Sequence, residues 1–183
     1  MNLTRDKNKQ HKLLTLVLGG SKSGKSQYAQ NLSETYPAPR LFIATARALD
    51  EEMKQKIERH KKQRGPGWCT IEEPLEIANA VEHNSNKYSV ILIDCITLWI
   101  SNMILKREVN QDEFEIQVNN LCKALEKALC PVIVVSNEVG MGIVPDTPLS
   151  RKFREYSGLA NQQIAKTVDR VTLCVAGLPL HLK

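Results

Sequence analysis

The sequence lacks long apolar runs, and its longest ones, such as Val90–Ile93, fall far short of the ~18–20 residues that a membrane span needs. Its first twelve residues are polar and lack the apolar stretch of a signal peptide. We therefore expect a cytoplasmic protein with no membrane span.

The sequence also lacks closely paired cysteines. Its five cysteines are an odd number, and no two of them have the C-x-x-C spacing of zinc and iron–sulfur sites. A disulfide framework is typical of small secreted chains with an even number of cysteines. We therefore expect these side chains to be reduced and mostly buried: Cys69, Cys95, Cys122, Cys130 and Cys174.

Aromatic residues make up only 5% of the sequence, which leaves few stacking platforms for single-stranded nucleic acid. The formal net charge is +5, and much of the positive charge lies in one segment, residues 54–64, which holds six Lys and Arg residues against one Glu. A small polyanionic ligand suits such a segment. We expect no nucleic-acid partner.

Short apolar runs alternate with stretches of helical periodicity. The runs predict strands at residues 13–18, 41–44, 68–71, 88–94, 131–136 and 170–175. Helices are predicted at residues 24–34, 50–62, 74–82, 96–105, 112–128 and 149–165, with Pro74 in the first turn of its helix. This alternation predicts one α/β domain at residues 13–183, with a mostly parallel sheet and helices on both faces, after a polar tail at residues 1–12.

A phosphate-binding motif follows the first predicted strand. The pattern G-x-x-x-x-G-K-[ST] is made of Gly19, Gly20, Ser21, Lys22, Ser23, Gly24, Lys25 and Ser26. Glycines let backbone N–H groups surround phosphate oxygens, the lysine brings charge to the β- and γ-phosphates, and the serine hydroxyl can bind Mg²⁺. Because a strand precedes the motif and a helix follows it, we predict a RecA-like P-loop NTPase fold.

Asp94 is the acid expected to complete this site. It follows four aliphatic residues at the end of a buried strand, as the Mg²⁺-organising carboxylate of P-loop enzymes does. The alternative reading is an N-cap for the helix that begins at Ile96. The two roles are compatible, so Ser26 and Asp94 are the predicted metal ligands.

Further segments point to one family. They are FIATA at residues 42–46, the basic segment 50–61, WCTIEEP at 68–74, SNEVGMGIVP at 136–145, and then Arg151, Phe153, Arg154, Gly158, Asn161 and Gln162. From Leu16 onward the chain resembles the bifunctional adenosylcobinamide kinase / adenosylcobinamide-phosphate guanylyltransferase family of cobalamin biosynthesis. Lys22 departs from the arginine more common there, which keeps the charge but loses a planar fork.

The resemblance implies two consecutive reactions. The γ-phosphoryl group of ATP or GTP goes to the aminopropanol hydroxyl of adenosylcobinamide, and GMP from GTP then goes to that new phosphate through a guanylylated histidine, His60. The implied nucleotide contacts are Ala44, Thr45, Ala46, Lys61, Lys62, Gln63, Glu72 and Asp94, beside the P-loop. The catalytic set is then His60, Lys25 and Asp94, with Mg²⁺ bound. Homo-oligomers, trimers among them, are also implied.

Alternatives remain open from the residues alone. His60 on a charged helix also suits an inert surface histidine, which would leave a single-function small-molecule kinase. A nucleic-acid motor and a catalytically silent nucleotide-binding regulator are the other classes considered. Glu138 suits either an orienting role toward Mg²⁺ or the attacking hydroxyl, or an ion pair with Arg151 or Arg154. Met141 and Ile143 are expected to pack against the corrinoid or a neighbouring subunit.

Overall fold

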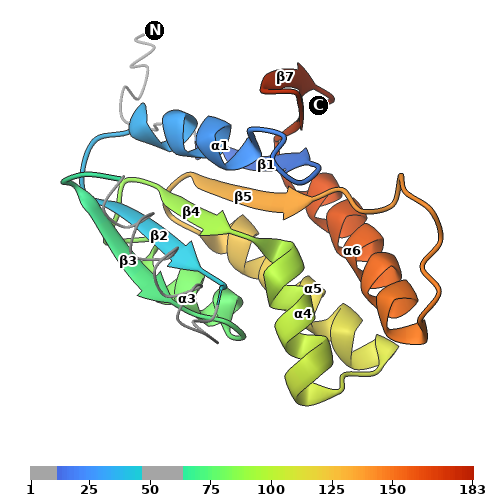
Figure 1. Cartoon of the computed structure of the whole chain (residues 1–183). Helices are drawn as coiled ribbons and strands as arrows, with labels where there is room; N and C mark the ends of the chain where they lie inside the picture. The colour runs from blue at the N-terminus through green and yellow to red at the C-terminus, as the bar shows by residue number, and fades with distance from the viewer. Residues whose placement is uncertain (1–11, 47–63) are drawn as a thin grey trace, which may run out of the picture.

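The computed structural model describes residues 12–46 and 64–183. Its centre is a seven-stranded sheet in the order β3-β2-β4-β5-β1-β6-β7 (Figure 1). All neighbouring strands pair in parallel except β6 and β7. The strands are β1 Leu14–Gly19, β2 Arg40–Ala44, β3 Trp68–Glu72, β4 Ile91–Asp94, β5 Val132–Asn137, β6 Arg170–Val175 and β7 Leu178–His181.

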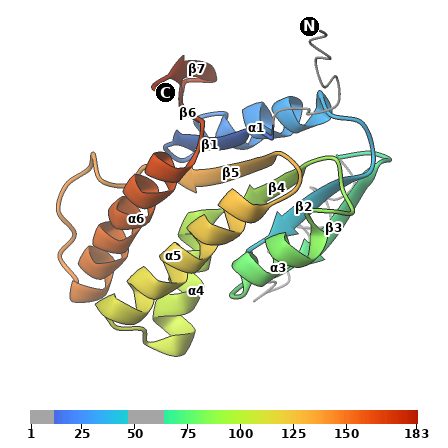
Figure 2. The ribbon, with the colours of Figure 1, turned by 180° about the vertical axis from the view of Figure 1, so that it is seen from behind.

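Helices cover both faces of the sheet, as Figures 1 and 2 show. Helix α1 lies on one face, and the other described helices lie on the opposite face. The described helices are α1 Lys25–Glu34, α3 Ile77–Asn84, α4 Ile96–Arg107, α5 Gln111–Lys127 and α6 Pro148–Thr167. The prediction of a mostly parallel α/β sheet with helices on both faces is therefore confirmed.

The core follows the two-residue period of the strands. In β1, Leu14, Leu16 and Leu18 pack into the larger cluster with α3–α6, whereas Val17 packs with Ala29 of α1. Strands buried on both faces read as continuous apolar runs, because neither face meets water. This is why apolar runs predicted the positions of β1, β4 and β5 well.

Two details differ from the predictions. Pro74 does not lie in the first turn of α3, which begins at Ile77, because the Glu73 carboxylate accepts hydrogen bonds from the backbone N–H groups of Leu75 and Glu76 and forms a turn first. Strand β7, which no pattern predicted, pairs antiparallel with β6 after a tight turn at Ala176 and Gly177. The predicted helix at 50–62 and nearly all of the tail at 1–12 lie outside the described residues.

The cysteine prediction is confirmed, because all five cysteines are free and only Cys69 is exposed. Burial raises the pKa of Cys130 to about 11, so this thiol is a poor nucleophile. Within residues 12–46 and 64–183, no helix has the length and apolarity to cross a bilayer.

Candidate active site

The phosphate loop, residues 19–26, joins the end of β1 to the start of α1. Gly24 is the N-cap of α1 with φ 92°, a left-handed conformation that favours glycine. Lys25 is buried, and its ammonium group donates a hydrogen bond of 3.0 Å to the carbonyl of Gly20. The lysine charge and the N-terminus of α1 therefore lie at the same loop, which suits it to bind an anion.

The turn between β6 and β7 packs directly against this loop. The N–H of Gly177 donates to the carbonyl of Ser23 at 2.9 Å. A Cβ on Gly24 would lie 3.0 Å from the Cα of Gly177, so this contact leaves no room for a side chain. Gly177 was not among the predicted site residues, because its contact with the phosphate loop joins distant parts of the chain.

Three predicted site residues meet at the carboxyl edge of the sheet. Ala44 is the register partner of Glu72 on one side and of Asp94 on the other. Carboxyl ends of parallel strands are where open α/β sheets bind ligands. The structure therefore brings together residues that are 50 positions apart in the sequence.

Asp94 and Lys25 act on one buried group, the Cys95 thiol. Burial is the largest cause of the raised pKa of Cys95; the Asp94 carboxylate raises it further, and the Lys25 ammonium partly opposes this. The acid of β4 and the lysine of the phosphate loop therefore both lie near the Cys95 side chain.

Thr45 is fully buried and braces the chain after β4. Its hydroxyl donates to the carbonyl of Cys95 at 2.7 Å and accepts from the N–H of the same residue at 2.8 Å. The Asn102 side chain of α4 donates to the carbonyls of Thr45 and Pro74. The Thr45 hydroxyl is thus engaged within the protein, and its predicted nucleotide contact stays a prediction.

Arg64 brings positive charge to the same region. Its guanidinium carbon lies 3.3 Å from the centre of the Phe42 ring, and it donates to the Thr70 hydroxyl at 3.0 Å. Burial lowers the pKa of Arg64, while the Asp94 carboxylate raises it. An arginine always remains charged in proteins, so it supplies a fixed cation near Asp94.

The loop from residue 138 to 147, here the β5–α6 loop, begins beside the phosphate loop. The N–H of Glu138 donates to the carbonyl of Gly19 at 3.1 Å, and its carboxylate accepts from the N–H of Gly140 at 2.6 Å. Arg154 donates to the carbonyl of Gly140, and Arg151 donates to the carbonyls of residues 145 and 146. In the described parts of the chain, Glu138 forms no ion pair with either arginine.

An asparagine chain ties this edge to α6 and α4. Asn161 donates from α6 to the backbone carbonyl of Asn137, and the Asn137 side chain donates to the Thr97 hydroxyl of α4. Asn137 lies in the family segment 136–145 but was not assigned to the site, and Thr97 was not singled out at all, because nothing in the local sequence indicates such a long-range contact.

The donors expected to hold Mg²⁺ fit that ion. Ser26 offers an exposed hydroxyl in the first turn of α1, and Asp94 offers a carboxylate at the end of β4. Mg²⁺ is usually held by one or two protein oxygens together with phosphates and water. Within residues 12–46 and 64–183, no cluster of three or more His, Cys, Asp or Glu residues could hold a metal by itself.

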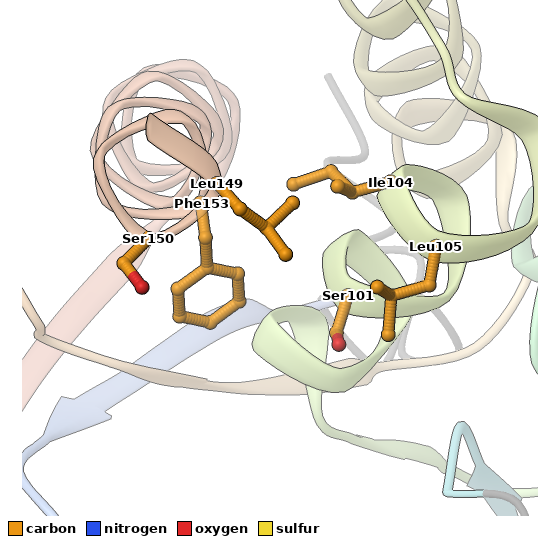
Figure 3. A pocket seen from close by; sticks show the side chains of 6 residues that line it. All are labelled: Ser101, Ile104, Leu105, Leu149, Ser150 and Phe153. Atoms are coloured by element: carbon orange, nitrogen blue, oxygen red, sulfur yellow. The ribbon is translucent and has the colours of Figure 1, made fainter. Parts of the chain in front are cut away.

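A hollow of about 230 Å³ lies between α4 and α6, and its lining differs from the residues around the phosphate loop. Figure 3 shows Ile104 and Leu105 of α4 facing Leu149 and Phe153 of α6 across it. In the part of the chain that the structure describes, no charged side chain lines it. It therefore lacks the cations that a triphosphate needs.

The predicted residues His60, Lys61, Lys62 and Gln63 lie outside the described residues. Comparison with known proteins covers them as part of the whole chain. Residues 15–182 match the family described as cobinamide kinase / cobinamide phosphate guanyltransferase. The chain belongs to this family.

Curated relatives agree with the family assignment. The bifunctional adenosylcobalamin biosynthesis protein CobP of Pseudomonas aeruginosa is 39% identical over 168 residues, which cover 92% of this chain and 96% of the relative. The bifunctional adenosylcobalamin biosynthesis protein CobU of Escherichia coli is 34% identical over 182 residues, covering 93% of this chain and all of the relative. The CobU protein of Salmonella typhimurium is also 34% identical. Family membership thus extends over both the phosphate loop and the β5–α6 loop.

Proposed function

We propose that this chain is an adenosylcobinamide kinase and adenosylcobinamide-phosphate guanylyltransferase. The observation that carries the proposal is the match of residues 15–182 to a family that covers both activities. The buried lysine of the phosphate loop and the carboxylate at the end of β4 supply the machinery that such a kinase needs.

In the first reaction the aminopropanol hydroxyl attacks the γ-phosphorus of ATP or GTP, and the bond to the bridging oxygen breaks. Backbone N–H groups of residues 19–26 hold the phosphates, and Lys25 offsets the charge on the β- and γ-oxygens. Ser26 and Asp94 would hold Mg²⁺, which when bound neutralises phosphate charge.

In the second reaction a neutral His60 imidazole attacks the α-phosphorus of GTP and releases pyrophosphate. The phosphate of the corrinoid then attacks the same phosphorus, and the P–N bond breaks. Four residues of chain span at most about 14 Å. His60 is four residues from Arg64, so the chain itself keeps the two within about 14 Å of each other. Burial lowers the pKa of Arg64, whereas the Asp94 carboxylate raises it, which places Arg64 near Asp94.

Incubation with GTP labelled on the α-phosphate tests this scheme. We expect an acid-labile, base-stable protein–GMP adduct that disappears in His60→Ala and persists in His83→Ala. His83 is the matched control because it is exposed on α3 and, among the described residues, its ring bonds only to the carbonyl of Asn79. Absence of the adduct in the native protein, with phosphorylation of adenosylcobinamide retained, would leave the single-function kinase.

We also propose a cytoplasmic homo-oligomer, for example a trimer, with small-molecule substrates and no nucleic-acid partner. The reduced cysteines support the compartment. Met141, Ile143 and Val144 of the β5–α6 loop are 81%, 95% and 63% exposed, and such apolar surface marks interaction sites. Light scattering during size-exclusion chromatography would measure the assembly, and a monomer at micromolar concentration would contradict it.

A further inference from the structure

A cavity of about 260 Å³ lies under α1, toward the end of β1 that is farther from the phosphate loop. Its lining includes Thr15 of β1, Tyr28 and Leu32 of α1, Arg170 and Thr172 of β6, and His181 of β7. Thr15 is the second residue of β1, whereas the phosphate loop begins where that strand ends. None of these residues belongs to the site described above.

Strand register puts the polar side chains of this cavity on one face of the sheet. Thr15 is the register partner of Arg170, and Thr172 is the partner of His181. Thr172 also pairs with Val17, which packs against α1. Register partners in neighbouring strands point to the same face, so all four polar side chains share the α1 face.

Hydrogen-bonding capacity is left over in this cavity. Thr15 is only 2% exposed, yet its hydroxyl has no hydrogen-bond partner in the described parts of the chain. The Thr172 hydroxyl lies 3.1 Å from Nδ1 of His181, which leaves the other ring nitrogen available. The Thr15 hydroxyl is not among the fully buried atoms that lack a partner, so it reaches the cavity and can donate a hydrogen bond to a ligand there.

The charged side chains that line the cavity, Arg170 and Lys183, are both cations. Arg170 forms no ion pair within the described residues, and its charge reaches the Tyr36 hydroxyl, whose pKa burial raises and Arg170 lowers. Among the described residues, no Asp or Glu side chain lines the cavity. The neighbouring Asp169 accepts from the backbone N–H of Leu14, and Lys183, which also lines the cavity, donates to carbonyls at the end of α6.

We propose that this cavity is a second ligand site, which binds a phosphate monoester. The guanidinium of Arg170, the Thr15 hydroxyl and one donor from the hydrogen-bonded pair of Thr172 and His181 match the several oxygens of a phosphate. The volume exceeds that of a phosphate group alone, and Tyr28 and Leu32 form an apolar wall for an organic group.

Phenyl phosphate and inorganic phosphate are the probes that test this site. The phosphate loop is first saturated with a non-hydrolysable β,γ-imido analogue of GTP, so that neither probe can bind there. Titration is followed by the NMR signals of the His181 ring. We expect saturable shifts with both probes and at least about tenfold tighter binding of phenyl phosphate. Equal affinity for the two probes would overturn the assignment of a monoester.

Two variants remove the proposed contacts. Arg170→Gln should weaken phenyl phosphate binding at least about tenfold, because a charge-assisted contact is lost. Thr15→Val keeps the shape of the side chain, and it should weaken binding about fivefold without lowering the thermal stability of the probe-free protein. Lys166→Gln is the charge control, because Lys166 does not line the cavity. Unchanged affinity in both Arg170→Gln and Thr15→Val, or no saturable shift in the native protein, would overturn the proposal.

Discussion

Two glycine-containing loops meet at the carboxyl edge of the sheet, and they are held in different ways. The phosphate loop is enclosed by backbone contacts from β5 and from the β6–β7 turn, and its lysine is buried. The β5–α6 loop is held by the Arg154 side chain, which donates to a backbone carbonyl of the loop. Its Met141 and Ile143 side chains are largely exposed. A small anion needs a fixed cradle of backbone donors, whereas a large apolar partner needs accessible side chains. The two loops are therefore suited to two different ligands.

Replacement of Lys25 should have the largest effect on the function of the phosphate loop. Lys25→Ala should lower kcat for phosphorylation of adenosylcobinamide by about 10²–10³-fold, because a preorganised charge on the transferred phosphate is lost. Lys87→Ala is the matched control, since Lys87 is exposed and lies outside the phosphate loop, and it should change kcat by less than about threefold. Steady-state phosphoryl transfer measures both, and native activity in Lys25→Ala would break the assignment of this loop.

The contact between Gly24 and Gly177 can be tested by adding a methyl group to each residue in turn. In Gly24→Ala the new Cβ would meet the Gly177 backbone at 3.0 Å in a left-handed conformation, so we expect a loss of about 2–4 kcal/mol in the free energy of unfolding and weaker GTP binding. Gly177→Ala adds a methyl group that meets nothing within 4 Å, and it should lose only about 1–2 kcal/mol from its backbone conformation. Denaturant titration compares the two, and equal losses would contradict the proposed close packing.

The β5–α6 loop should respond in its local order rather than in global stability. Arg154→Ala removes the hydrogen bond to the Gly140 carbonyl, but it also removes a buried guanidinium nitrogen, Nη1, without a partner in the described residues. We expect a change of less than about 1 kcal/mol in the free energy of unfolding. Hydrogen exchange of amides 140–143 should accelerate, and unchanged exchange would show that Arg154 does not hold the loop.

The smallest effect on folding is expected at the tip of that loop. Ile143 is 95% exposed, so Ile143→Ser should leave the free energy of unfolding within about 0.5 kcal/mol of the native value. The same change should weaken self-association if a neighbouring subunit covers the side chain. Sedimentation at several protein concentrations distinguishes the variant from the native chain, and a large loss of stability would contradict the exposed position.

Local patterns predicted the phosphate loop, Asp94 and the buried strands, because each depends on neighbours within a few residues. Strand β7 escaped prediction, since its four residues are exposed and include Pro179, which interrupts the usual signal. The contact of Gly177 with the phosphate loop joins residues about 150 positions apart, which no local pattern encodes. The same holds for the contact of Asn161 with Asn137, because the family resemblance included both residues but no local pattern indicated that they meet.

The place of β1 in the sheet has a consequence for biosynthesis of the protein. Both of its ladder partners, β5 and β6, come more than 110 residues later in the chain. While a ribosome is still making the middle of the protein, the first strand therefore has no native neighbour to pair with. The phosphate loop that follows this strand is therefore not held in place until β5 and β6 have been made, and we expect GTP binding by newly made protein only after that point.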